Sequence, residues 1–129
     1  MNKRVEFPVL TFNGPFDKQL LSLVVPLFNE RQMLPLFFDR VLPILANLNL
    51  RWEVVLVDDG SDDGSAQYIR NVIDRTPGVR LIKLSRNFGK EAAMTAGLEH
   101  ARGDAVIVLD ADLQDPPEQI PAMVDCWQS

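Results

Sequence analysis

The stretch VIVLDADLQDPPE, Val106 to Glu118, decides how this sequence is interpreted. It opens with an apolar, largely β-branched run, typical of a strand that is covered on both faces. The run stops abruptly, and Asp110 and Asp112 follow with one small residue between them. Two carboxylates at the end of a buried strand suggest a function at that edge of the fold. The endings of the other apolar runs show which further residues lie there.

The same pattern occurs three more times earlier in the chain. Each run is rich in Val, Ile and Leu, and each ends in polar residues. Near-continuous apolar runs of this length predict parallel strands covered on both faces. The four runs with their endings are LLSLVVPLFNE from Leu20, WEVVLVDDGS from Trp52, VRLIKLSRN from Val79 and DAVIVLDAD from Asp104.

Apolar residues at helical spacing lie between these runs and after the last one. The third helical segment also has a face of small residues that suits close packing on a sheet, and Asp115 and Glu118 predict a capping box at the start of the fourth. The stripes are Leu34, Phe37, Val41, Leu45 and Leu48; Ile69, Val72 and Ile73; Met94, Leu98 and Ala101; and Ile120, Met123, Val124 and Trp127.

This alternation predicts an α/β fold: a doubly wound, mostly parallel sheet with helices on both faces and right-handed crossovers. We place the domain at residues 20–129, incomplete at its C-terminal end, and treat residues 1–19 as an N-terminal extension. In a parallel sheet all four polar strand endings lie on one edge. Open α/β sheets bind their ligands in the crevice outside that edge, and we therefore expect the ligand site there.

Composition narrows the classes of function. The 129 residues carry a formal net charge of -5, which gives no reason to expect a nucleic-acid partner. The single cysteine, Cys126, excludes an internal disulfide and favours a reducing compartment. No apolar run is long enough for a signal peptide or a membrane span, so the chain taken alone is expected to be soluble and cytoplasmic.

The spacing of Asp110 and Asp112 predicts a metal site. Residues i and i+2 of an extended segment point the same way, and two like charges so close need a positive partner. A hard divalent cation, Mg²⁺ or Mn²⁺, accepts one or two carboxylates together with phosphate oxygens of a ligand. The arrangement therefore suits a cation bound jointly with a diphosphate.

The sequence lacks the Gly-rich phosphate-binding motifs of P-loop and dinucleotide-binding proteins. The turn GSDDGS carries two aspartates that would repel phosphate, so we expect it beside a nucleoside base and ribose. Arg86 and Lys90, near the same edge, are the candidates for contact with phosphate or base.

The blocks VVPLFNE, VDDGSDDGS, LSRNFGKEAAMTAGLEHARGD and VLDADLQDPPE, in this order, resemble glycosyltransferase family 2. They are most similar to its polyprenyl-phosphate branch, the dolichol-phosphate mannosyltransferases and the bacterial undecaprenyl-phosphate glycosyltransferases. The resemblance implies a GT-A fold and inverting transfer of a sugar from a nucleotide-diphosphate donor, with UDP preferred, to a polyprenyl phosphate. It also implies a divalent metal and, for the full-length protein, a place at the cytoplasmic side of the inner or plasma membrane.

The resemblance assigns residues to the nucleoside part of the donor. Pro26, Phe28 and Glu30 match positions that line the nucleoside pocket, with Phe28 where family members usually carry Tyr. Val57 and Asp59 match positions that hold the base and ribose.

The resemblance also assigns the residues of the reacting centre. Asp110, Ala111 and Asp112 match the metal and diphosphate motif, which Gln114 follows as it does in the family. Asp112 and Gln114 are therefore the candidate catalytic residues.

Relatives continue beyond the matching blocks, so we expect this chain to hold the donor half of an enzyme and to lack transfer activity alone. The strand from Val106 to Leu109 is then left with an unpaired edge that favours self-association. Two alternatives stay open: a catalytically silent nucleotide-binding or interaction module, and a haloacid-dehalogenase-like phosphatase. The phosphatase uses D-x-D after its first strand, whereas here the motif follows the fourth run.

Overall fold

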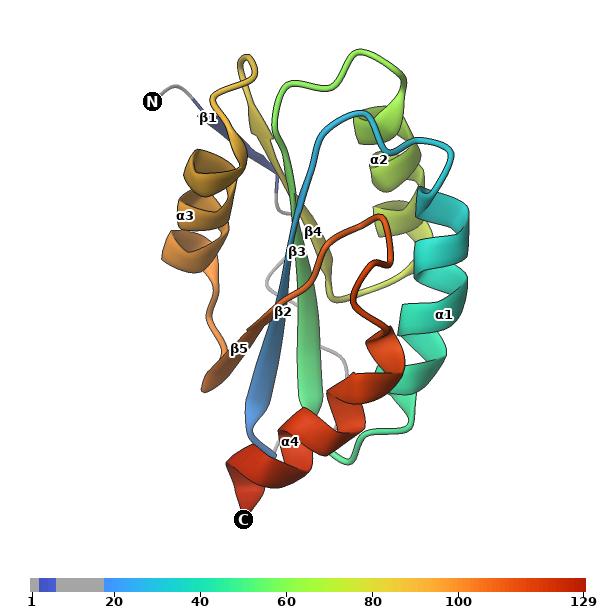
Figure 1. Cartoon of the computed structure of the whole chain (residues 1–129), viewed down its shortest axis with the longest axis vertical. Helices are drawn as coiled ribbons and strands as arrows, with labels where there is room; N and C mark the ends of the chain where they lie inside the picture. Colours follow the sequence, from blue (N-terminus) through green and yellow to red (C-terminus); the bar gives the residue numbers. More distant parts are fainter. Residues whose placement is uncertain (1–2, 7–17) are drawn as a thin grey trace.

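The computed structural model describes residues 3–6 and 18–129, and the strands in them form one sheet (Figure 1). The strand order is β1-β4-β3-β2-β5. The strands β2, β3, β4 and β5 run parallel, as predicted, and β1 pairs antiparallel with β4. The predicted mostly parallel sheet is confirmed. The strands are β1 (Lys3–Glu6), β2 (Leu20–Leu27), β3 (Arg51–Asp58), β4 (Val79–Leu84) and β5 (Ala105–Val108).

Helices cover both faces of the sheet. Buried residues of α1, α2 and α4 form the larger core with one face, and α3 forms a smaller core with the other. None of the helices in residues 3–6 and 18–129 combines the length and the hydropathy needed to span a bilayer. The helices are α1 (Leu34–Ala46), α2 (Ser65–Arg75), α3 (Lys90–His100) and α4 (Ile120–Gln128).

The small face of α3 packs on the sheet, as its sequence predicts. Ala93 and Ala96 are fully buried, whereas Leu98 on the outer side of the helix is 46% exposed. Gly97 makes the closest approach: a Cβ atom there would lie 2.4 Å from Cγ1 of Val24 on β2. The absence of a side chain at Gly97 therefore sets the separation between α3 and the strands beneath it.

The predicted capping box is wrong. A 3₁₀ turn, Pro117–Gln119, precedes α4, and no side chain caps the helix that begins at Ile120. The spacing from Asp115 to Glu118 therefore does not coincide with the first turn of the α-helix. The Glu118 carboxylate instead pairs with the guanidinium of Arg40 on α1.

An ion pair lies inside the sheet, between charged residues that interrupt the apolar runs of β3 and β4. Glu53 on β3 is fully buried and Arg80 on β4 is 2% exposed, with Nη2 of Arg80 2.7 Å from Oε1 of Glu53. The second carboxylate oxygen accepts the Ser22 hydroxyl and, at 2.8 Å, the Arg102 N–H. Arg80 also donates to the His100 carbonyl at 2.7 Å. The network links three strands to the segment that leads from α3 into β5.

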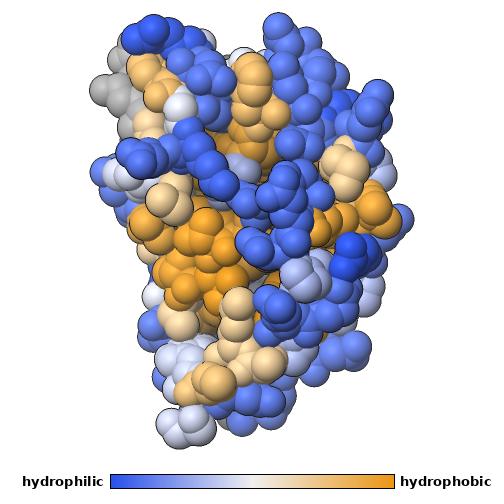
Figure 2. Space-filling view, in the orientation of Figure 1, coloured by the Kyte–Doolittle hydropathy of each residue, from blue (hydrophilic) through white to orange (hydrophobic). Residues whose placement is uncertain are grey.

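The strand β5 ends the sheet and carries exposed valines. In the described part of the chain it pairs with β2 alone, and Val106 and Val108 are 40% and 38% exposed. Figure 2 shows hydrophobic surface on this side of the molecule. An apolar edge strand offers both unpaired backbone groups and apolar surface to another copy of the chain.

We expect the 129-residue chain to self-associate through this edge. A lysine on an edge strand opposes such pairing, so Val108→Lys should weaken association about tenfold, the equivalent of one buried valine. Sedimentation velocity over a concentration series measures the effect. Leu36→Lys, at an exposed apolar residue of α1, is the matched control. Equal association of the two variants would contradict the assignment.

Candidate functional site

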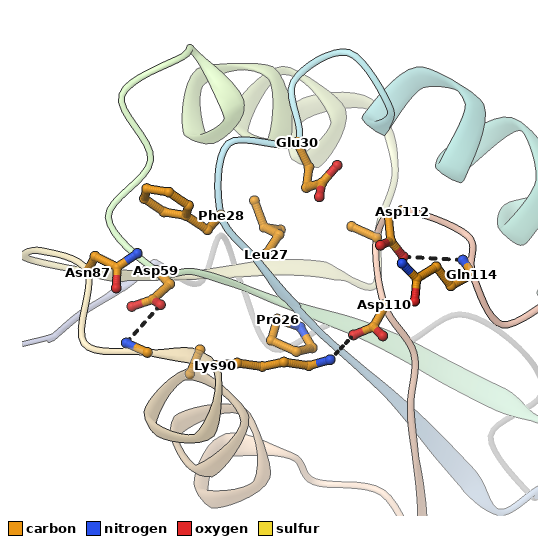
Figure 3. A pocket seen from close by; sticks show the side chains of 13 residues that line it. Pro26, Leu27, Phe28, Glu30, Asp59, Asn87, Lys90, Asp110, Asp112 and Gln114 are labelled. Carbon is orange, nitrogen blue, oxygen red and sulfur yellow. Dashed lines mark hydrogen bonds and ion pairs between the residues drawn. The ribbon is translucent and has the colours of Figure 1, made fainter.

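A cavity of about 370 Å³ opens at the carboxyl edge of the parallel strands, beside the first turn of α3 (Figure 3). Its walls come from the ends of β2 and β3, the segment between β4 and α3, and the segment after β5. This is the edge at which the sequence places the ligand crevice. The lining residues are Pro26, Leu27, Phe28, Glu30, Asp59, Asn87, Gly89, Lys90, Ala93, Asp110, Ala111, Asp112 and Gln114.

Hydrogen bonds join the segment after β2 to the GSDDGS turn after β3. Asn29 donates its N–H to the Ser61 hydroxyl at 2.8 Å, and its Oδ1 accepts the Asp62 N–H at 2.9 Å. The Arg31 N–H donates to Oδ2 of Asp63 at 3.0 Å. Asn29 has a φ of 52°, in the left-handed region that asparagine tolerates better than most residues. The GSDDGS turn itself does not line the cavity, but these hydrogen bonds hold in place the segment after β2, whose Phe28 and Glu30 do.

Asp59 connects the end of β3 to the start of α3. It is 3% exposed, and its Oδ1 and Oδ2 accept the N–H groups of Phe88 at 2.8 Å and Gly89 at 3.0 Å. The next residue, Gly60, has a φ of 81°, and a Cβ atom there would lie 2.5 Å from the backbone of Arg86. The glycine lets the two segments approach, so that Asp59 can hold the entrance to α3.

Asp59→Asn is therefore expected to lower the free energy of unfolding by about 1–3 kcal/mol, the range for a buried donor left without its acceptor. The amide keeps one acceptor oxygen and turns its NH₂ group toward a backbone N–H. Urea denaturation followed by circular dichroism measures the change. Asp62→Asn alters an exposed side chain of the same turn and should stay within about 0.5 kcal/mol of the native chain. Equal losses in the two variants would contradict the role of Asp59.

The segment after β5 presents its two aspartates on one side of the cavity (Figure 3). Oδ1 of Asp110 lies 2.8 Å from Nζ of Lys90, which reaches it from the first turn of α3. Oδ1 of Asp112 accepts the N–H of Gln114 at 3.2 Å. Leu113 between them has a φ of 64°, a left-handed conformation that turns the chain sharply after the motif.

Negative charge dominates the cavity. Four of its lining residues are carboxylates, and Lys90 is the one cation among the described residues around it. Burial raises the pKa of Glu30, and the nearby charges of Asp112, Asp63 and Asp110 raise it further. The cavity therefore favours a cation, or a ligand that brings one.

The donor set fits a metal that is shared with a ligand. Within residues 3–6 and 18–129, no group of three or more His, Cys, Asp or Glu side chains is placed to hold a metal ion. Asp110 and Asp112 supply two carboxylates, which is the number that Mg²⁺ commonly takes from protein when phosphate oxygens complete its coordination. The charges of Asp112 and Asp110 also contribute to the raised pKa of Glu30, after its burial, so negative charge is concentrated at this edge of the cavity. The residues present thus fit Mg²⁺ or Mn²⁺ bound together with a diphosphate.

Most of the residues predicted for the site meet at this cavity, and two do not. Val57 is fully buried on β3 and faces α3, with Cγ2 3.0 Å from the position that a Cβ of Gly97 would take. The exposed Arg86 places its guanidinium 4.5 Å from the centre of the Phe88 ring, outside the lining. Those that line the cavity are Pro26, Phe28, Glu30, Asp59, Lys90, Asp110, Ala111, Asp112 and Gln114.

Four lining residues were not predicted for the site: the polar Asn87, which ends the third apolar run, and Leu27, Gly89 and Ala93, which carry no polar side chain. Gly89 opens α3 with a φ of 108°, and Ala93 lies one turn further along the same helix. The sequence did offer a signal for Gly89 and Ala93. Both are small and lie at the start of the helix that follows the third strand ending, and a small residue there lets a ligand approach the backbone.

The fold and the cavity define an α/β domain with a cavity at the carboxyl edge of a parallel sheet. The sequence model described as Glycosyl transferase family 2 matches residues 22–129. The chain belongs to this family. The match sets aside the haloacid-dehalogenase-like alternative, which requires its D-x-D motif after the first strand.

Curated relatives narrow the branch of the family. The chain is 48% identical over 112 residues to the undecaprenyl-phosphate 4-deoxy-4-formamido-L-arabinose transferase of Pseudomonas savastanoi pv. phaseolicola, covering 85% of this chain and 33% of the relative. It is 42% identical over 118 residues to the dodecaprenyl-phosphate galacturonate synthase of Rhizobium johnstonii, covering 91% and 35%. The chain thus spans about a third of the length of these relatives.

Among known structures, the fold is similar to that of the mannosyltransferase PcManGT from Pyrobaculum calidifontis, determined in complex with GDP-Man and Mn²⁺. The TM-score is 0.73 at 25% sequence identity, and the match covers 96% of this chain and 36% of that one. The predicted α/β architecture of the GT-A type is confirmed.

Proposed function

We propose that this chain is the donor-binding part of a glycosyltransferase. The enzyme transfers a sugar from a nucleotide-diphosphate donor, with uridine as the preferred base, to the phosphate of a polyprenol such as undecaprenol or dolichol. The observation that carries the proposal is the pair Asp110 and Asp112 at the carboxyl edge of a sheet of this family. Residues 20–129 form the donor-binding domain, and residues 1–19 precede it.

The names of the relatives support a polyprenyl phosphate as the acceptor of the sugar. Two enzymes that this chain resembles over most of its length are named for undecaprenyl phosphate and dodecaprenyl phosphate. An acceptor of this kind is confined to a bilayer by its lipid chain. We therefore place the full-length protein at the cytoplasmic side of the membrane, where nucleotide sugars are available.

The nucleoside part of the donor would bind between the wall that carries Phe28 and the end of β3. Phe28 is 44% exposed at the mouth of the cavity and offers a ring face on which a base can stack. Glu30 and Asp59 line the same side and can accept hydrogen bonds from base N–H and ribose hydroxyl groups. Pro26 forms part of the apolar floor.

The diphosphate part would lie toward α3 and the segment after β5. Asp110 and Asp112 would hold Mg²⁺ or Mn²⁺ against the phosphate oxygens, and Ala111 between them leaves room for the ligand. When bound, the cation supplies Lewis-acid stabilisation of the departing nucleotide diphosphate. Gln114, at the outer end of the motif, can hydrogen-bond to the sugar or to the acceptor phosphate.

The reaction would need little proton transfer from the protein. An oxygen of the lipid phosphate forms a bond to the anomeric carbon as the bond from that carbon to the diphosphate breaks, which inverts the configuration. A phosphate is anionic near neutral pH, so the attacking group needs no strong general base. The work left to these residues is to orient the donor and to stabilise its charge.

Equilibrium binding tests the proposal. UDP and GDP are titrated into the purified chain by calorimetry, once with Mn²⁺ and once with EDTA. We expect binding of at least one nucleotide with Mn²⁺ and a large loss with EDTA. The full-length enzyme is then given labelled nucleotide sugar and undecaprenyl phosphate. Lipid-linked label is the expected product, and release of free phosphate without it would contradict the proposal.

A further inference from the structure

Lys90 and Asp110 meet across the cavity from different elements. Lys90 is the first residue of α3, and Asp110 follows β5. Their charged atoms, Nζ and Oδ1, are 2.8 Å apart, with side chains 66% and 24% exposed. Figure 3 shows the lysine side chain extended along the cavity toward the aspartate. The lysine thus occupies an oxygen of the proposed cation ligand.

The surroundings make this lysine different from an ordinary surface charge. It is the one cation among the described residues around a cavity with four carboxylates. Its ammonium lies 2.8 Å from the carboxylate of Asp110, and Asp112 lines the same cavity. An ammonium group that carries three donors can satisfy a carboxylate oxygen, and a divalent cation binds the same oxygen.

We propose that Lys90 competes with the divalent cation for Asp110 and moves to the diphosphate of the donor when the cation binds. The inference rests on the proposed function, because it assumes that nucleotide and cation share this cavity. It assigns Lys90 two opposing effects: the ammonium weakens binding of the cation alone and strengthens binding of the nucleotide that accompanies it.

The side chain of Lys90 is suited to such a move. It is mostly exposed, its stem has rotatable bonds, and an exposed ion pair contributes little stability, so that breaking it costs little. Once displaced, the ammonium lies beside the position proposed for the phosphates, where it can form charge-assisted hydrogen bonds. Cation and nucleotide would therefore bind with positive coupling, each raising the affinity of the other.

The substitution Lys90→Met tests both effects in the purified 129-residue chain. Free Mn²⁺ is counted by electron paramagnetic resonance during titration with MnCl₂ alone. UDP and GDP are then titrated by calorimetry at saturating Mn²⁺. Two variants serve as controls. Lys90→Arg keeps a positive charge at the site, and Lys83→Met removes a lysine from β4, outside the cavity, and so lowers the net charge equally.

We expect Lys90→Met to bind Mn²⁺ alone about two- to fivefold more tightly than the native chain, the upper part of the range that one exposed ion pair supplies. The same variant should bind the nucleotide at saturating Mn²⁺ about tenfold more weakly, because one charge-assisted hydrogen bond is lost. Both control variants should behave as the native chain does in the Mn²⁺ titration.

Unchanged or weaker Mn²⁺ binding by Lys90→Met would overturn the inference. If the native chain still binds nucleotide only with Mn²⁺, that result leaves the proposed function intact. Nucleotide binding that ignores Mn²⁺ in the native chain would instead overturn the proposed function and this inference together.

Discussion

Glu53→Ala is expected to lower the free energy of unfolding by about 3–5 kcal/mol, the range for removing one partner of a buried ion pair. The variant leaves the Arg80 guanidinium, which is 2% exposed, without the carboxylate that faces it. Burial already lowers the pKa of Arg80, which shows that its charge is costly at this position. The Ser22 hydroxyl and the Arg102 N–H lose their acceptor at the same time.

Urea denaturation of three variants separates the loss of the pair from the loss of a side chain. The double variant Glu53→Leu with Arg80→Met removes both charges and should recover much of the stability, since an apolar replacement of a buried pair is often neutral. Glu118→Ala breaks the exposed pair with Arg40 and should change stability little. A Glu53→Ala variant as stable as Glu118→Ala would show that the buried network contributes nothing.

Asp112→Asn is expected to weaken nucleotide binding at saturating Mn²⁺ by about 100-fold, on the order of 3 kcal/mol, because a neutral amide replaces a charged ligand of the cation. The fold should persist, because Asp112 lies on the rim and an amide oxygen can still accept the Gln114 N–H.

Calorimetric titration of the nucleotide and the thermal midpoint without ligand measure the two effects on the same samples. Asp115→Asn is the matched control, since it removes one negative charge from an exposed residue of the same segment outside the cavity lining. Native-like Mn²⁺-dependent affinity in Asp112→Asn would contradict the metal role. A shared loss of affinity in the two variants would point to general charge effects.

Most of the architecture could be predicted because local pattern and tertiary environment agree. The run VVLV on β3 is covered on both faces of the sheet, and its uniformly apolar sequence predicts this burial correctly. Parallel order then brings the strand endings to one edge, which is why the sequence alone places Asp59, Asp110 and Asp112 at one site.

The features that escaped prediction depend on contacts between distant residues. Lys3–Glu6 is a short, mostly polar stretch, and it becomes β1 by pairing with β4, about 80 positions further along the chain. Glu53 is spaced like any strand residue, and its burial is satisfied by Arg80, which the sequence does not link to it. Val57 matches a site position of the family, yet its side chain is buried under α3.

Gly97 influences the cavity from outside its lining, because it sets how closely α3 packs on the sheet. The helix α3 carries Lys90 in its first turn and Gly97 two turns later, a distance of about 10 Å along a rigid rod. A methyl group at Gly97 would collide with Val24. An alanine there is therefore expected to push α3 away from the sheet and to displace its first turn as well. We therefore expect the size of residue 97 to alter the shape of the cavity, although Gly97 is not one of the residues that line it.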